Sequence, residues 1–301
     1  MLNWLTKILI GTKKTPRTTV ATDSANGTSA QSELLNESSM QDIQTRVIFD
    51  ACPLCKAKEI QTLLTADCSK HPLYNHAISP TMTWRKCVAC KHIFTDGYFT
   101  KNALEIIFGK THEYQKVGFD IENQRYVSAR MIEKVLPYAQ TGDWLDVGFG
   151  NGSLLFTAHE YGFTPVGVDL RKDNVEALKV IGIEAYSIDI AELKQTGRFT
   201  VISLADVLEH MPYPGDSLRI VHSLLNSSGV LLLSLPNGDS ILWEALNENN
   251  HNPYWGELEH YHNFGRKRLY QLLRDSGFEP VRFGISERYR ACMEVVAKKV
   301  G

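Results

Sequence analysis

The chain has 301 residues, which is enough for one large domain or two modest ones built around a hydrophobic core. Its 32 basic and 34 acidic residues give a formal net charge of −2, which argues against a protein that binds the nucleic-acid backbone. No apolar run reaches the roughly 18–20 residues of a membrane-spanning helix, and the composition excludes a collagen, a coiled coil and a disulfide-rich miniprotein.

The first 46 residues are predicted to be a disordered segment with a short amphipathic start. Apolar side chains at positions 4, 5, 8 and 9 share one helical face, and lysines and an arginine interrupt or follow them. A frayed terminus is the favoured interpretation, and weak contact of residues 1–17 with an anionic membrane surface is the alternative. Because the charges follow the apolar run, the pattern is not that of a secretory signal. We expect a cytoplasmic protein, with peripheral attachment at the inner membrane face as the alternative.

Residues 47–100 form a cysteine module. Cys52-Pro-Leu-Cys55 and Cys87-Val-Ala-Cys90 are two CxxC pairs separated by 31 residues. This spacing is typical of a zinc ion held by four thiolates, and it predicts structural zinc. Disulfide or redox chemistry is the alternative, but it needs an oxidising compartment. Cys68 lies outside the pairs, as does the cysteine at position 292, and both are expected to be free buried thiols.

Residues 101–137 are predicted to be a helical connector. Apolar side chains recur at helical spacing, first around Leu104 and Ile107 and then from Ala129 to Leu136, before Pro137. This connector is expected to cover one face or edge of the domain that follows it.

Residues 138–301 alternate short apolar runs with amphipathic stretches, which indicates a parallel sheet with helices on both faces. The expected strands are residues 144–147, 165–169, 183–188, 199–204 and 230–235. After a last helix, residues 281–283 and 292–297 are expected to form a hairpin at the sheet edge.

A glycine-rich loop follows the first of these strands. The string Asp146-Val-Gly148-Phe-Gly150-Asn-Gly152 lets the backbone approach a ligand at the carboxyl end of the sheet. A dinucleotide would require glycine where Ser153 stands, and an acid two residues before the first glycine suits the ammonium of S-adenosylmethionine (SAM) better than a pyrophosphate. The acid at the end of the next strand, 21 residues after the first glycine, is placed to accept hydrogen bonds from ribose hydroxyls.

From about Thr141 onward, these motifs resemble those of class I SAM-dependent methyltransferases. Leu204-Ala-Asp-Val-Leu-Glu-His-Met211 is similar to the signature after the fourth strand of that family, and the cysteine module resembles the zinc ribbon of many bacterial small-molecule and cell-envelope-sugar methyltransferases. The resemblance implies a doubly wound, seven-stranded, Rossmann-like α/β sheet with a small N-terminal zinc ribbon. It implies SAM-binding roles for Asp146, Gly148, Gly150, Gly152, Asp169, Leu170, Asp189, Ile190 and Asp206. It also implies zinc bound by Cys52, Cys55, Cys87 and Cys90.

Three histidines are candidate catalytic residues. His210 follows the fourth strand, where the methyl group should emerge, and it could take a proton from the acceptor; a plain capping role for it and its neighbour is the alternative. His260 and His262 share one face of an extended segment and could line the acceptor pocket, whereas a metal role for them lacks an assignable third ligand. Tyr254 and Trp255, in an insertion before the last helix, either close over substrate or pack.

The leading prediction is an enzyme that methylates a small molecule or an envelope glycan, most simply at oxygen. The first alternative is a protein or RNA methyltransferase in which the zinc ribbon grips the substrate, although nucleic acid is disfavoured by the acidic charge. The second alternative is a non-catalytic subunit that scaffolds a partner, which the intact glycine loop argues against. The identity of the acceptor and the oligomeric state stay open.

Overall fold

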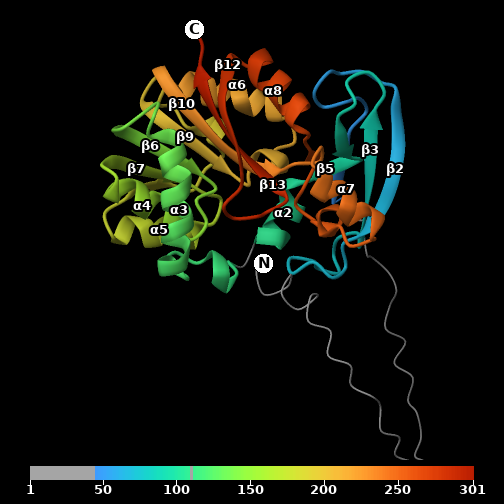
Figure 1. Cartoon of the computed structure of the whole chain (residues 1–301). Helices are drawn as coiled ribbons and strands as arrows, with labels where there is room; N and C mark the ends of the chain where they lie inside the picture. Colours follow the sequence, from blue (N-terminus) through green and yellow to red (C-terminus); the bar gives the residue numbers. More distant parts are fainter. Residues whose placement is uncertain (1–44, 109–110) are drawn as a thin grey trace, which may run out of the picture. The chain divides into compact units, whose positions relative to one another are not determined.

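The computed structural model describes residues 45–108 and 111–301 (Figure 1). The described residues belong to one compact unit. The predictions for the first 44 residues, including the amphipathic start, lie outside the described residues. In the part of the chain that is described, no helix combines the length and the apolar character needed to cross a bilayer.

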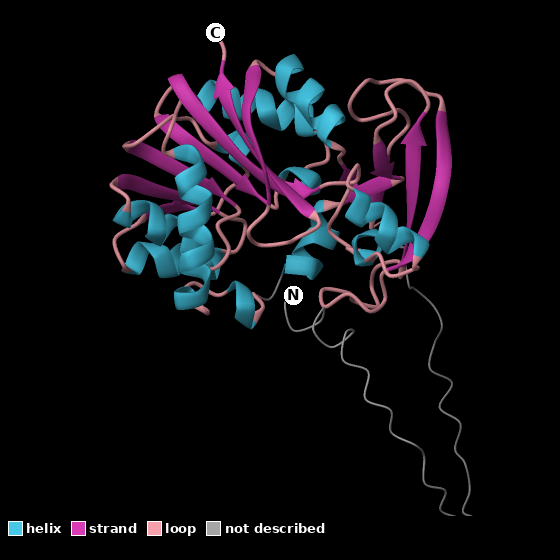
Figure 2. Cartoon of the chain, viewed as in Figure 1, coloured by secondary structure: helices cyan, strands magenta, loops and turns pink. Residues whose placement is uncertain are grey.

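A seven-stranded mixed sheet forms the larger part of this unit, in the order β12-β13-β10-β9-β6-β7-β8 (Figure 2). Its strands are β6 (Gly142–Val147), β7 (Phe163–Val168), β8 (Glu184–Tyr186), β9 (Phe199–Ala205), β10 (Leu225–Pro236), β12 (Phe278–Ile285) and β13 (Cys292–Lys299). Five neighbouring strands run parallel, and β13 pairs antiparallel with both β10 and β12. The predicted α/β sheet and its closing hairpin are therefore confirmed.

Helices cover both faces of this sheet, as the alternation of strands and amphipathic stretches requires (Figure 1). On one face lie α3 (Ile121–Val135), α4 (Ser153–Glu160) and α5 (Lys172–Val180). On the other face lie α6 (Pro214–Leu224) and α8 (Arg266–Asp275), whose leucines join the largest apolar cluster. Helix α3 belongs to the predicted connector, and it packs where the connector was expected, on one face of the sheet.

The cysteine module is built on a second sheet of four strands, in the order β11-β4-β3-β2. Its strands are β2 (Ile60–Asp67), β3 (Thr81–Cys87), β4 (Ile93–Thr95) and β11 (His262–Asn263). A two-stranded sheet of β1 (Arg46–Ile48) and β5 (Gly97–Phe99) and the helix α2 (Lys101–Phe108) complete the N-terminal region. Strand β11 comes from the far end of the chain, so the module is completed by a segment that follows the larger sheet's β10.

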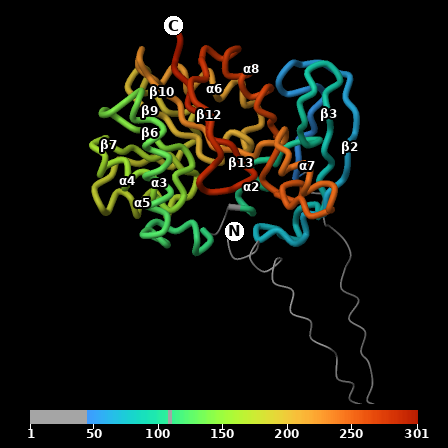
Figure 3. The backbone as a smooth tube through the Cα atoms, in the orientation of Figure 1, coloured from blue at the N-terminus to red at the C-terminus, as the bar shows by residue number. Residues whose placement is uncertain are grey.

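The insertion between β10 and α8 packs on the cysteine module. It carries α7 (Ile241–Glu248) and the short 3₁₀ helix η4 (Pro253–Gly256), and the backbone trace follows it to the side of β2 and β3 (Figure 3). The indole N–H of Trp84 donates to the carbonyl oxygen of Trp255 at 2.9 Å, and the two rings meet edge to face. Trp255 therefore packs against the module.

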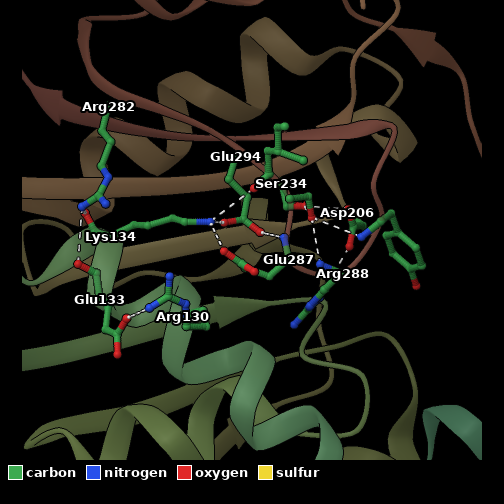
Figure 4. Close-up of polar contacts among 12 residues, drawn as sticks. Arg130, Glu133, Lys134, Asp206, Ser234, Arg282, Glu287, Arg288 and Glu294 are labelled. Atoms are coloured by element: carbon green, nitrogen blue, oxygen red, sulfur yellow. Dashed lines mark hydrogen bonds and ion pairs between the residues drawn. The ribbon is translucent and has the colours of Figure 1, made fainter. Parts of the chain in front are cut away.

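A buried ion pair joins α3 to the C-terminal hairpin (Figure 4). Lys134 Nζ lies 2.5 Å from a carboxylate oxygen of Glu294 and 3.0 Å from one of Glu287. Glu294 is 1% exposed, and its other oxygen accepts the backbone N–H of Glu287. A buried carboxylate is tolerated when it is paired and hydrogen-bonded in this way, and it becomes costly when its cation is removed.

We therefore expect Lys134→Met to lower the free energy of unfolding by about 3 kcal/mol, because it leaves the Glu294 carboxylate buried without its cation. The measurement is urea denaturation followed by circular dichroism. Arg130→Met is the matched control on the same helix, since Arg130 pairs with Glu133 in an exposed position and should contribute about 0.5 kcal/mol or less. Equal effects of the two substitutions would contradict this assignment.

Candidate active site

The glycine loop turns sharply between β6 and α4. Gly148, Gly150 and Gly152 have φ angles of 68°, 54° and 78°, which L side chains rarely adopt. A Cβ atom on Gly148 would approach Val207 Cγ2 to 2.8 Å. The three glycines thus leave a backbone turn without side chains at the carboxyl edge of the sheet, and such a turn is suited to holding a ligand closely.

Asp169 follows β7 on the neighbouring strand and braces this loop. It is 3% exposed; one carboxylate oxygen accepts the N–H of Gly150 at 3.2 Å and the other accepts the N–H of Arg171 at 2.8 Å. Leu170 beside it is 55% exposed. The predicted ribose acid and the glycine loop are therefore in direct contact.

Asp146, near the end of β6, is buried and is linked through Ser203 to Trp144 by hydrogen bonds. Trp144 donates its indole N–H to Ser203 Oγ at 2.9 Å, and Ser203 Oγ donates to Asp146 at 2.6 Å. Burial raises the pKa of Asp146 to about 6, while the hydrogen bond from Ser203 and the charge of Arg288 oppose that rise.

Asp206 comes directly after β9 and has a φ angle of 60°. It accepts a hydrogen bond from Ser234 Oγ at 2.9 Å and lies 3.6 Å from a guanidinium nitrogen of Arg288 (Figure 4). Burial raises its pKa, and Arg288 works in the opposite direction. Arg288 lies near both acids. No motif in the sequence singles it out, because it lies in the loop of the C-terminal hairpin.

Asp189 and Ile190 lie beyond β8. The exposed carboxylate of Asp189 accepts the N–H of Ala191 at 2.8 Å and caps the 3₁₀ helix η2 (Ile190–Glu192). Ile190 is buried in the large apolar cluster. The structure therefore gives Asp189 a local capping role, alongside the adenine-binding role that the resemblance implies.

His210 and His260 meet at this edge of the sheet. His210 ends the 3₁₀ helix η3 (Leu208–His210), and its ring centroid lies 4.8 Å from that of His260. Glu209 places a carboxylate oxygen 3.9 Å from His210 Nε2. The ligand atoms of these three side chains lie within 4.8 Å of one another. We call Glu209, His210 and His260 the edge cluster.

The charge state of the edge cluster follows from its burial. Burial lowers the pKa of His210 to about 3, and the nearby charge of Arg171 acts in the same direction. Burial also lowers the pKa of His260, and it raises the pKa of Glu209. Both imidazoles are neutral at pH 7, so His210 is a much weaker base than the near-neutral one expected from the sequence.

His262 is placed apart from the edge cluster by its hydrogen bonds. It is 1% exposed; its Nε2 lies 2.9 Å from the carbonyl oxygen of Met211, and its Nδ1 lies 3.0 Å from His92 Nε2. The carbonyl requires His262 Nε2–H as donor, so His92 donates in turn to His262 Nδ1. With both nitrogens engaged, His262 links the cysteine module to the segment after η3.

Further titratable groups near the edge cluster come from distant parts of the chain. His71 lies 2.9 Å from a carboxylate oxygen of Glu257, and the two residues are 186 positions apart. Burial raises the pKa of Glu259 to about 7. Sequence reasoning missed His71 and Glu257, since neither belongs to a motif. Glu209 stood in a recognised string, but a neighbouring Glu and His fit a capping pair equally well.

The four paired cysteines converge, with their sulfur atoms all within 4.8 Å of one another. Cys52 and Cys90 are 3.7 Å apart at sulfur, and Cys55 and Cys87 are 3.5 Å apart. Tetrahedral Zn²⁺ with bonds of about 2.3 Å separates its sulfur ligands by about 3.8 Å. The spacing of the four sulfurs and the all-thiol donor set fit zinc.

The two CxxC turns have the same shape. The residue after each pair has a φ angle near 60°, and its N–H donates to the carbonyl oxygen of the first cysteine: Lys56 to Cys52, and Lys91 to Cys87. Two matched turns of this kind present four sulfurs to one point from opposite sides.

Comparison with known proteins agrees with this geometry. Residues 121–282 match the family described as "Methyltransferase domain". The chain belongs to this methyltransferase family. The α/β fold with its seven-stranded mixed sheet is that of the class I SAM-dependent methyltransferases.

Among curated proteins, the methyltransferase resembles enzymes named ubiquinone biosynthesis O-methyltransferase. The mitochondrial enzyme of Candida albicans is 33% identical over 110 residues, which cover 33% of this chain and 34% of that protein. The enzyme of Xanthomonas oryzae pv. oryzae is 32% identical over 120 residues, which cover 37% of this chain and 48% of that protein. The match therefore spans less than half the length of these relatives.

Among solved structures, the methyltransferase shares its fold with a Burkholderia thailandensis enzyme, 1,6-didemethyltoxoflavin-N1-methyltransferase, which was solved with bound S-adenosylhomocysteine. That likeness has a TM-score of 0.52 at 18% identity and covers 71% of this chain and 98% of that one. A Haloferax volcanii complex between the Trm112 methyltransferase activator and a methyltransferase contains a chain with a TM-score of 0.50 at 11% identity, covering 60% of this chain and 92% of that one. These likenesses concern the fold alone.

Proposed function

We propose that this methyltransferase transfers a methyl group from SAM to a hydroxyl oxygen of a small molecule, such as a free metabolite or a sugar-type acceptor. The observation that carries the proposal is the edge cluster. Its members Glu209 and His210 follow β9, at the same sheet edge as the glycine loop, and His260 joins them. Its neutral imidazoles can accept hydrogen bonds from an acceptor hydroxyl. The names of the curated relatives, which are O-methyltransferases, support oxygen as the acceptor atom.

The residues at the glycine loop fit SAM. Gly150 leaves open space beside the backbone, and Asp169 carries a carboxylate suited to ribose hydroxyls. Asp146 and Asp206 supply negative charge for the ammonium group. SAM would supply a methyl carbon bonded to a positively charged sulfur, which keeps the electron pair of the broken bond. The chain's own work is to hold the acceptor oxygen in line with that carbon and to exclude water.

We expect Asp169→Ala to weaken SAM binding by about 100-fold, because it removes charge-assisted hydrogen bonds and releases the glycine loop from its brace. Asp189→Ala is the matched control; it removes an exposed carboxylate that caps η2, and it should weaken SAM binding by about threefold or less. Isothermal titration calorimetry measures both. Equal losses in the two variants would show that the ribose lies elsewhere.

Incubation with methyl-labelled SAM and a cell extract tests the reaction itself. We expect the label in the small-molecule fraction, and we expect His260→Asn to lower the rate by about 100-fold while SAM affinity stays within about threefold. Label in protein or RNA would instead support the alternative in which the cysteine module docks a macromolecule. A failure to bind SAM at about 100 μM would support a scaffold without catalysis.

We also propose that Cys52, Cys55, Cys87 and Cys90 bind one structural zinc ion. The support is the sulfur spacing and the two matched turns. Zinc in such a site closes a loop of the chain and stabilises a module whose core is small. It takes no part in methyl transfer, which needs no metal at the thiolates.

Protein purified under reducing conditions and dialysed against metal-free buffer without chelator should keep about one zinc per chain. Cys87→Ser should lose that zinc and make the four-stranded sheet sensitive to protease, while the seven-stranded sheet stays folded. Cys68→Ser is the matched control, since Cys68 is a buried cysteine outside the cluster and its loss should leave the zinc in place. Mass spectrometry of the metal content decides; wild-type protein free of zinc would refute the assignment.

A further inference from the structure

We propose that Glu209, His210 and His260 form a second metal site, which binds a divalent cation of the Mn²⁺, Co²⁺ or Fe²⁺ type. A metal role for the histidines of this segment lacks a third ligand when the sequence is read alone. The structure supplies that ligand, because Glu209 and His210 on η3 meet His260 from the segment before β11.

The distances suit one ion. Ligand atoms bound to the same ion at about 2.1 Å lie at most about 4.2 Å apart. The oxygen of Glu209 and Nε2 of His210 are 3.9 Å apart, and the whole set lies within 4.8 Å. The two rings meet at an interplanar angle of 68°. A small side-chain rotation brings all three donors onto one ion.

Glu209 provides an independent observation that points to a cation. It is 0% exposed, and neither of its carboxylate oxygens has a hydrogen-bond partner. A buried carboxylate without a partner is one of the costliest groups a fold can contain, and a bound cation removes that cost. Asp206 and Glu259 add negative charge nearby, while Arg171 and His71 lie close enough to oppose it.

The donor set distinguishes this site from the cysteine site. Two imidazoles and one carboxylate are ligands of intermediate hardness that accept Mn²⁺, Fe²⁺, Co²⁺ or Zn²⁺, whereas four thiolates favour zinc. Three protein ligands leave coordination positions open, as in catalytic metal sites. If the proposed O-methyl transfer holds, those positions would bind the acceptor's hydroxyl groups, and the ion would make a bound hydroxyl a stronger acid.

The test is a titration of the zinc-containing protein, dialysed against metal-free buffer without chelator, with Mn²⁺, followed by the electron paramagnetic resonance signal of free Mn²⁺. Neither SAM nor acceptor is present, so the result does not depend on the proposed reaction. We expect one Mn²⁺ per chain, and we expect Glu209→Gln to weaken binding by about 100-fold or more. His222→Gln is the matched control, because His222 contacts the carbonyl oxygen of Val300 and is outside the ligand set.

Thermal unfolding shows whether a variant that fails to bind Mn²⁺ is still folded. Glutamine has the shape of glutamate, so Glu209→Gln should fold. Mn²⁺ should raise the Tm of wild-type protein and of His222→Gln but not that of Glu209→Gln. No loss of the free Mn²⁺ signal at about 1 mM metal, or equal binding by wild type and Glu209→Gln, would overturn the proposal. Methyl transfer that fails while Mn²⁺ binds would instead count against the proposed function alone.

Discussion

The pairing of β11 with β4 is the contact on which the rest of the site depends. Strand β11 has two residues, His262 and Asn263, which pair with Phe94 and Ile93. Residue 260 of the edge cluster comes two positions before this strand, and α8 begins three positions after it. The cysteine module therefore fixes the segment that carries His260, and it does so through backbone hydrogen bonds as well as through packing.

Side-chain hydrogen bonds extend this connection from the cysteine module towards the edge cluster. His92, next to the second CxxC turn, donates to His262, and His262 donates to the carbonyl oxygen of Met211. Met211 directly follows His210 in the chain. An ion that holds the two CxxC turns together would thus set the position of the edge cluster through two buried histidines. The cysteine module thus supports the edge cluster, through a contact between His92 and His262, which are 170 positions apart in the chain.

The sequence predicts those parts of the molecule that local patterns determine. Strand β9 was predicted within one residue, since a continuous apolar run between polar turns has few other solutions. Strand β10 begins at Leu225, five residues before the predicted start at residue 230. Its pairing with β9 is irregular between Leu225 and Val230, so the continuous apolar run begins only at Val230 and does not reveal the first pairing. The glycine loop and both CxxC pairs were found because their function requires fixed spacing.

The contacts that local patterns do not determine could not be predicted. Strand β11 is too short for any periodicity, and the pairs His71–Glu257 and His92–His262 join residues whose sequence neighbourhoods carry no shared motif. The metal-binding role proposed for Glu209 depends on its burial. A single sequence does not show whether a polar pair such as Glu-His after a strand is buried or exposed.

A comparison of two buried carboxylates in the same fold supports the metal site proposed at Glu209. Glu294 is as inaccessible as Glu209, but it has a lysine 2.5 Å away and a backbone N–H on its second oxygen. Among the described residues, Glu209 has no hydrogen-bond partner on either oxygen. The chain thus places a lysine beside the buried acid Glu294. Beside Glu209, within the described part of the chain, it places no cation but two neutral imidazoles, those of His210 and His260. An arrangement that leaves a carboxylate unpaired beside two metal-binding rings is costly to fold. Binding a cation from outside the chain at that position would offset the cost.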